Sequence, residues 1–220
     1  MKKITGFLLG VFFIVLGSCS NDGKDTEEAE AVMQPIARTQ IPDVAFEQAL
    51  IELGIDDIED GSVITSDLEM VTSLVMNDKG IANLTGISDF PMLENLWVND
   101  NQISSLDVSK NTLLKFVFIE NNGLTMLNVT NLAILEKISA TNNNLTQLDI
   151  SDNSMLQLLS VANNSLSGID ISGIPNSVQL NTFAVENNPL DCIEVNTEIL
   201  NSIPPQWTKD EGDSYSLECN

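Results

Sequence analysis

The chain has 220 residues and a formal net charge of −23, because 32 acidic residues outnumber 9 basic residues. A surface this acidic repels nucleic acid and anionic membranes, so we expect neither as a direct partner. The chain contains no histidine, which excludes a Ser-His-Asp triad, a Cys-His pair and a histidine metal ligand. We therefore expect no enzyme activity, no cofactor and no metal ion.

The chain begins with a basic segment followed by an apolar segment. Met1-Lys2-Lys3 precedes an apolar run from Phe7 to Leu16, which leads into Gly17-Ser18-Cys19. This order is typical of a secretory signal peptide, here residues 1–18, and the apolar run is too short to span a bilayer. Its ending resembles a bacterial lipobox, which implies that Cys19 receives lipid and becomes the first mature residue. The alternative is an ordinary signal peptide with an incidental cysteine.

Residues 19–40 are predicted to form a flexible tether. They contain few large apolar side chains and a cluster of acidic residues between Asp22 and Glu30. Such a composition cannot bury a core. An acidic cluster directly after a lipidated cysteine resembles the export signal of Bacteroidetes-type surface lipoproteins, which implies display at the outer membrane. A plain solvated linker is the alternative interpretation.

Residues 41–70 are predicted to form a helical cap. A helix is expected between Ile41 and Gly54, with Asp43 as its N-cap and Gly54 at its end. Such an amphipathic helix suits the open end of a repeat array, which would otherwise expose its core. The acidic residues between Asp56 and Asp60 lack EF-hand spacing and are expected to form a solvated turn.

Residues 71–191 repeat with a period of 21 residues, and the final spacing is 24. Each unit reads L-x-x-L-x-L-x-x-N-x-L, with other apolar residues at some leucine positions. The asparagine positions are Asn101, Asn122, Asn143, Asn164 and Asn188. A fixed period of this length indicates a solenoid. Alternating apolar residues predict a short strand in each unit, and stacked asparagines predict a buried ladder of side-chain amides.

The repeat pattern resembles the leucine-rich repeat family, in its short 21-residue, internalin-like bacterial form. An atypical first unit has Lys79 at the asparagine position, and six strands are expected to start near residues 73, 95, 116, 137, 158 and 182. The resemblance implies an α/β repeat solenoid with a curved parallel sheet of about six strands. Its return segments are expected to be extended or tight turns, and residues 41–70 resemble the N-terminal cap of secreted bacterial members.

Residues 192–220 are predicted to form the C-terminal cap. Cys192 and Cys219 remain once Cys19 is assigned to lipid, and both lie outside the regular repeats. In an exported chain a disulfide between them is expected, and it would close the cap onto the last repeat. Two free thiols are the alternative.

Carboxylates recur at one repeat position, at Asp107, Asp149, Asp170 and Glu194, and Asn128 occupies the same position in another unit. Paired carboxylates can hydrolyse glycosidic bonds. Recurrence at one structural position is, however, what a turn requires, and we interpret these residues as turn formers.

In the leucine-rich repeat family, residues between the core positions project from the concave face of the sheet. Three aromatic residues, Trp97, Phe116 and Phe118, are therefore expected to face solvent on neighbouring strands. Around them the same alternation places Asn95, Asn99, Glu120, Lys137 and Leu158. Exposed aromatic clusters with polar rims are typical of binding surfaces, although an aromatic pair also stabilises a sheet.

The resemblance implies a lipid-anchored binding or adhesion module of the cell envelope, with a protein as the expected partner. A glycan-binding lipoprotein and a purely structural envelope protein are the two alternatives. The lipid is the only membrane contact expected.

Overall fold

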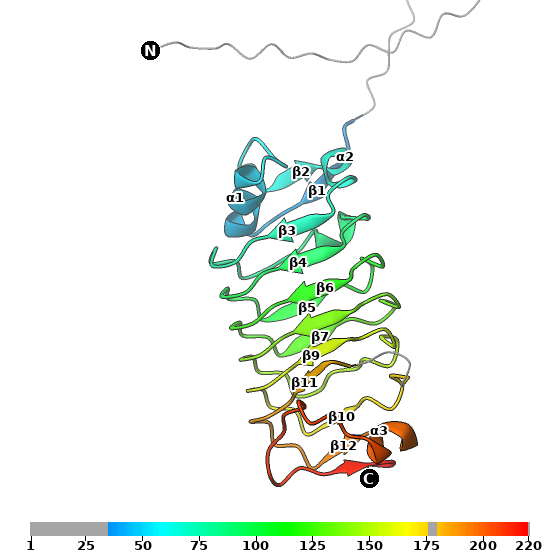
Figure 1. Ribbon diagram of the computed structural model, residues 1–220. Helices are drawn as coiled ribbons and strands as arrows, with labels where there is room; N and C mark the ends of the chain where they lie inside the picture. The colour runs from blue at the N-terminus through cyan, green and yellow to red at the C-terminus, as the bar shows by residue number, and fades with distance from the viewer. Residues whose placement is uncertain (1–34, 176–179, 220) are drawn as a thin grey trace, which may run out of the picture. The chain divides into compact units, whose positions relative to one another are not determined.

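The computed structural model describes residues 35–175 and 180–219. The predicted signal peptide, Cys19 and residues 20–34 of the predicted tether lie outside the described residues. Ile36–Asn220 form one compact unit, in which successive turns of the chain stack into a solenoid (Figure 1).

Six short strands, one from each repeat, form the main parallel sheet. In spatial order they are β3 (Ser73–Val75), β4 (Asn95–Trp97), β6 (Phe116–Phe118), β8 (Lys137–Ser139), β9 (Leu158–Ser160) and β11 (Thr182–Ala184). The central residue of every strand is buried, because side chains alternate between the core and the opposite face. The predicted parallel sheet of six strands is confirmed, with each strand at its predicted start.

The return segments form smaller sheets. Strands β5 (Ser105–Asp107) and β7 (Met126–Asn128) pair with each other, while β10 (Gly168–Asp170), β12 (Cys192–Glu194) and β13 (Tyr215–Ser216) form a three-stranded sheet. In the part of the repeats that the structure describes, the only helical element is the 3₁₀ helix η1 (Ile87–Asp89). The predicted extended return path is therefore confirmed, and apolar side chains from both sides fill one continuous core.

The N-terminal cap consists of β1 (Arg38–Gln40), α1 (Val44–Glu52), β2 (Ser62–Ile64) and α2 (Thr65–Leu68). Asp43 caps α1 as predicted, since its Oδ1 accepts a hydrogen bond from the Phe46 N–H at 2.9 Å. Its Oδ2 accepts the N–H groups of Ala82 and Asn83, which ties the cap to the first repeat. The positive φ of Gly54, 72°, turns the chain just after the helix.

Strand β1 extends the folded cap into the segment assigned from sequence to the tether. It pairs antiparallel with β2, from Arg38 opposite Ile64 to Gln40 opposite Ser62. Three residues with one buried side chain carry too short a pattern to indicate a strand. The folded unit therefore includes residues 38–40, which the sequence analysis placed outside it.

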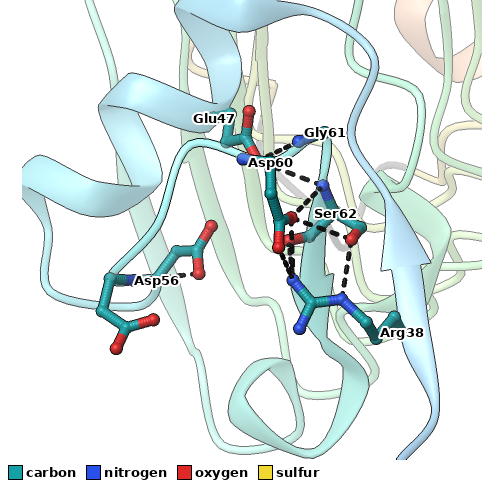
Figure 2. A network of polar contacts seen from close by, with 7 residues as sticks. Arg38, Glu47, Asp56, Asp60, Gly61 and Ser62 are labelled. Atoms are coloured by element: carbon teal, nitrogen blue, oxygen red, sulfur yellow. Dashed lines mark hydrogen bonds and ion pairs between the residues drawn. The ribbon is translucent and has the colours of Figure 1, made fainter.

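The acidic turn between α1 and β2 is tied down by two polar groups (Figure 2). Oε1 of Glu47, a residue that is only 1% exposed, accepts the N–H groups of Asp60, Gly61 and Ser62 at 2.9, 2.6 and 3.0 Å. Arg38 donates to both carboxylate oxygens of Asp60 at 2.8 and 2.6 Å. The Ser62 hydroxyl, followed by Arg38, lowers the pKa of Asp60. The expectation of a merely solvated turn is therefore wrong, because the turn is a hydrogen-bonded part of the cap.

The C-terminal cap closes both rows of strands. After α3 (Thr197–Asn201) the chain bridges Thr208 to Ala184 beside β11, and β13 then pairs with β12. The disulfide between Cys192 and Cys219 forms as predicted, with a Cα–Cα distance of 5.8 Å. Such bonds are typical of proteins from oxidising compartments.

An aromatic side chain seals the core at this end. Trp207 packs against Phe183 with ring centroids 4.9 Å apart, and its Nε1 donates to the Leu180 carbonyl. Tyr215 packs on Trp207, and its burial raises the pKa of its hydroxyl. The last repeat is therefore covered by aromatic rings.

Candidate functional site

The outward residues of the six-stranded sheet form a surface that we call the outer face. Parallel pairing aligns them in columns across the strands, so that Val75, Trp97 and Phe118 lie beside one another, as do Asn95 and Phe116. The columns continue through Ser139, Ser160 and Ala184, and through Lys137, Leu158 and Thr182. The 21-residue period imposes this register because every repeat has the same path.

Trp97, Phe116 and Phe118 lie together on the outer face as one aromatic cluster. The Trp97 ring lies parallel to that of Phe118, with a 5° interplanar angle and centroids 5.8 Å apart. It is tilted by 56° against Phe116, at 6.4 Å. All three side chains are half-buried, because each covers part of its neighbours. The cluster therefore combines a fixed geometry with ring surface that remains open to solvent.

Lys137 lies beside this cluster on β8. Its Nζ is 4.9 Å from the centroid of the Phe116 ring, which is cation–π contact. Leu158 follows in the same column on β9 and is half-buried, as is Asn95 on the other side of Phe116. The structure thus places Asn95 and Lys137 next to Phe116, and Leu158 one strand further along, beside Lys137.

Asn99 and Glu120 occupy the third column of the outer face. Asn99 Oδ1 accepts the N–H of Glu120 at 2.8 Å, and Asn99 N–H donates to Asn77 Oδ1 at the same distance. The Glu120 carboxylate accepts a hydrogen bond from the Ser139 hydroxyl at 2.5 Å. All eight residues predicted for the binding face therefore lie on one surface of the sheet.

The ladder asparagines hold the turns that follow these strands. Asn143 is 7% exposed, and its Nδ2 donates to the carbonyls of Ile119 and Ala140 at 2.9 and 3.0 Å. Its Oδ1 accepts the Leu124 N–H at 2.9 Å. Equivalent bonds join the preceding repeat to each of the other ladder residues, Asn101, Asn122, Asn164 and Asn188. Each amide therefore links two repeats and fixes the spacing of the outer face.

Lys79 stands where the first repeat would have its ladder asparagine. In the described residues the N-terminal cap, and not another repeat, precedes this unit, and the Lys79 ammonium pairs with Glu52 at the end of α1. Lys79 N–H and Ile81 N–H both donate to Asn101 Oδ1. The departure from the repeat pattern thus coincides with the junction between array and cap.

Two further series of Asp and Asn residues have structural roles that the sequence analysis did not predict. The residue before each ladder position has a positive φ of 52–58°. These residues are Asp78, Asp100, Asn121, Asn142, Asn163 and Asn187. Asn and Asp tolerate this left-handed conformation better than other non-glycine residues. The recurring Asp or Asn before each ladder position could therefore have indicated a left-handed turn there.

The second series lies in the core, where Asn111 and Asn153 are fully buried. The Nδ2 of Asn111 donates to the Ile87 and Phe90 carbonyls, and that of Asn153 donates to the Val129 and Leu132 carbonyls. Each of these asparagines connects its return turn to the preceding one. Leu132 occupies the same position in the unit between them, so the sequence did not indicate that the asparagines are buried and bonded.

Three of the four recurring carboxylates form turns as predicted, whereas Glu194 instead accepts the N–H of Cys219 at 3.3 Å. Asp107, Asp149 and Asp170 each accept the N–H of the residue two positions further on, at 2.9, 3.0 and 2.8 Å, and Asn128 accepts in the same way. The Ser109 hydroxyl and N–H lower the pKa of Asp107, and the Ser151 N–H and hydroxyl lower that of Asp149. The shared repeat position therefore has a local structural role.

Neither a protein-family model nor a curated protein sequence matches the chain. Among solved structures, the functional domain of InlJ from Listeria monocytogenes is similar over 86% of this chain, with 24% identity and a TM-score of 0.61. The chain spans half the length of that structure, which includes a cysteine ladder.

Two other solved structures are similar to the chain at lower sequence identity. Internalin C2 from Listeria monocytogenes matches 83% of this chain and 92% of its own, with 20% identity and a TM-score of 0.52. A pollen receptor kinase 3 matches 68% of this chain and 80% of its own, with 19% identity and a TM-score of 0.51. Together with the repeat architecture, these likenesses show an internalin-type leucine-rich repeat fold.

Proposed function

We propose that the outer face binds a protein partner, and that a lipid on Cys19 displays the chain at the outer membrane of the cell envelope. The observation that carries the first part is the aromatic cluster of Trp97, Phe116 and Phe118. Its three half-buried rings gather on one face of a rigid sheet, at neighbouring register positions. Aromatic side chains contribute a large share of binding energy at protein interfaces.

The surroundings of the aromatic cluster support a protein ligand. Asn95, Asn99 and Glu120 supply hydrogen-bonding groups at its rim, and Leu158 adds an apolar contact. A central apolar patch with a polar rim is the usual anatomy of a protein interface. The ladder asparagines fix the strands beneath it, so little conformational freedom would be lost on binding.

The lipid anchor is a proposal from Met1–Cys19 alone. In the described residues, no helix is long and apolar enough to cross a membrane. The disulfide supports an exported location, because such bonds persist in oxidising compartments. Intact-mass measurement of the mature protein should show lipid on Cys19, and an unmodified Cys19 would disprove the anchor.

A cross-linking pull-down from envelope or host extracts tests the binding surface. The variant Trp97→Ala with Phe118→Ala should keep the fold, because both side chains point away from the core, but should lose about 2 kcal/mol or more of binding. The matched control is Asp149→Ala with Asp170→Ala, on the return segments, which should retain the partner. Normal capture by the aromatic variant would refute the proposal. Binding to a glycan array in place of protein would select the glycan-binding alternative.

A further inference from the structure

The aromatic cluster lies next to the carboxylate of Glu120. Glu120 follows Phe118 by two positions and projects from the same face, about 7 Å further along the strand. The Ser139 hydroxyl bonds one of its oxygens and so fixes the carboxylate. Among the described residues, no Lys or Arg forms an ion pair with Glu120. Parallel Trp97 and Phe118 rings and a fixed carboxylate are thus side by side.

The aromatic cluster already holds one cation from its own chain. Lys137 places its ammonium against the Phe116 ring. The Trp97 and Phe118 rings have no such contact within the part of the chain that the structure describes. Aromatic faces attract cations through their quadrupole, and a neighbouring carboxylate adds direct charge attraction. A basic side chain from a partner would therefore meet both at one place.

A second carboxylate lies further along the same column. Glu186 is separated from Glu120 by Thr141 and Ala162, in an order fixed by backbone hydrogen bonds between successive turns. It accepts a hydrogen bond from the Thr208 hydroxyl and, in the described residues, forms no ion pair. Three strand spacings make the separation about 14 Å.

Only small side chains cover the surface between the two carboxylates. Ser139, Ser160 and Ala184 occupy the neighbouring column, and Thr141 and Ala162 lie between Glu120 and Glu186. These side chains are small, so a partner backbone can approach the sheet closely. In an extended chain, residues four apart point to the same side and are also about 14 Å apart.

We propose that the outer face recognises an extended partner segment with two basic residues four positions apart. This inference rests on the proposed function and names the chemistry of the partner. The first basic residue stacks on the Phe118 ring, which Trp97 backs from the other side, and pairs with Glu120, and the second pairs with Glu186. Arginine fits the first position better than lysine, because a planar guanidinium can stack on a ring and bond a carboxylate at once. The formal charge of −23 favours the same basic partner over long range.

Calorimetric titration of the full chain with synthetic peptides tests the inference. The probe is acetyl-Gly-Arg-Ser-Gly-Ser-Arg-Gly, and the matched peptide has both arginines replaced by neutral citrulline. The arginine peptide should bind at least about tenfold more tightly. Equal binding of the two peptides, or no binding of the arginine peptide, would overturn the inference.

Protein variants locate the site. Glu120→Gln keeps an acceptor for Ser139 and should fold normally, yet it should weaken binding of the arginine peptide by about tenfold, as should Phe118→Ala. Glu186→Gln should weaken binding several-fold. The control Glu211→Gln removes one exposed charge elsewhere and should change binding by less than about twofold. If Glu120→Gln and Glu211→Gln lost equal affinity for the peptide, net charge alone would explain the binding, and the proposed site would be wrong.

The two proposals fail in different ways. The partner could be lost by the variant Trp97→Ala with Phe118→Ala but captured normally by Glu120→Gln and Glu186→Gln. The outer face would then bind a protein without recognising basic residues in it. If the aromatic variant holds its partner normally, the proposed function itself fails.

Discussion

Asn143 lies in the middle of the ladder, and its amide bonds both to its own turn and to the preceding one. An alanine there would leave the buried Leu124 N–H without its acceptor and would remove one of the two amide donors to each of the Ile119 and Ala140 carbonyls. We expect Asn143→Ala to lower the free energy of unfolding by about 1–3 kcal/mol, measured by urea denaturation. Asn144→Ala is the matched control, because its side chain is exposed, and it should change stability by less than about 0.5 kcal/mol. Equal losses in the two variants would contradict the ladder.

The lowered pKa of Asp149 should make the free energy of unfolding depend on pH. Hydrogen bonds from Ser151 lower its pKa in the folded state. A lowered folded-state pKa gives stability that is present above the ordinary carboxyl pKa and is lost as the pH falls through the lower value. Asp149→Asn keeps the turn acceptor, as Asn128 does naturally, and should match wild type at pH 7 within about 0.5 kcal/mol.

The same variant should lose less stability than wild type between pH 7 and pH 3, because it has no carboxylate to protonate at this turn. Urea denaturation across that range measures the difference. Since Asp149 is largely exposed, the difference should stay below about 1 kcal/mol. Identical slopes for the two proteins would argue against the stabilised carboxylate.

At the scale of elements, the N-terminal cap depends on one buried carboxylate. Glu47 joins α1 to the start of β2 through three backbone N–H groups (Figure 2). Glu47→Ala should cost about 2–4 kcal/mol, since those groups lose a charged acceptor. Glu47→Gln retains one acceptor oxygen and should cost less, and the exposed neighbour Gln48→Ala should have little effect. Thermal melting compares them, and an unchanged melting temperature in Glu47→Ala would rule out this role.

The disulfide holds the other cap. It links residues 27 positions apart, and in the chain-entropy model its loss costs about 3.5 kcal/mol. Cys192→Ser with Cys219→Ser should therefore melt lower than wild type, and reducing agent should affect only wild type. Hydrogen exchange should speed up mainly in residues 208–216, because central repeats contact only their neighbours. Faster exchange throughout the repeats would show that the caps and repeats unfold together.

At the scale of the whole molecule, repetition decides how much could be predicted. The six strands and the columns of the outer face follow from the 21-residue period, because one register error would have moved every Leu out of the core. The helix α1, the extended return path and the Cys192–Cys219 pairing also follow from local signals. Repeats of one sequence pattern adopt one structure, so each unit supports the assignment of the next.

Features that neither repeat nor carry a recognisable sequence signal could not be predicted. Strand β1 is polar at both ends and depends on its pairing with β2. The bonds of Glu47 join a helix to a turn 13–15 residues away, and nothing in a glutamate on a helix indicates burial. In the candidate site, outward positions were predictable, but the hydrogen bond between Glu120 and Ser139 depends on side-chain conformation.

Site-specific photo-cross-linking tests most directly whether the outer face is the binding surface. The photoreactive residue p-benzoylphenylalanine would replace Phe116 in the aromatic cluster or, as control, Met126, which is 53% exposed on β7 of the separate β5–β7 sheet. We expect a covalent adduct with the captured partner from position 116 and none from position 126. An adduct from position 126 with none from position 116 would contradict this expectation.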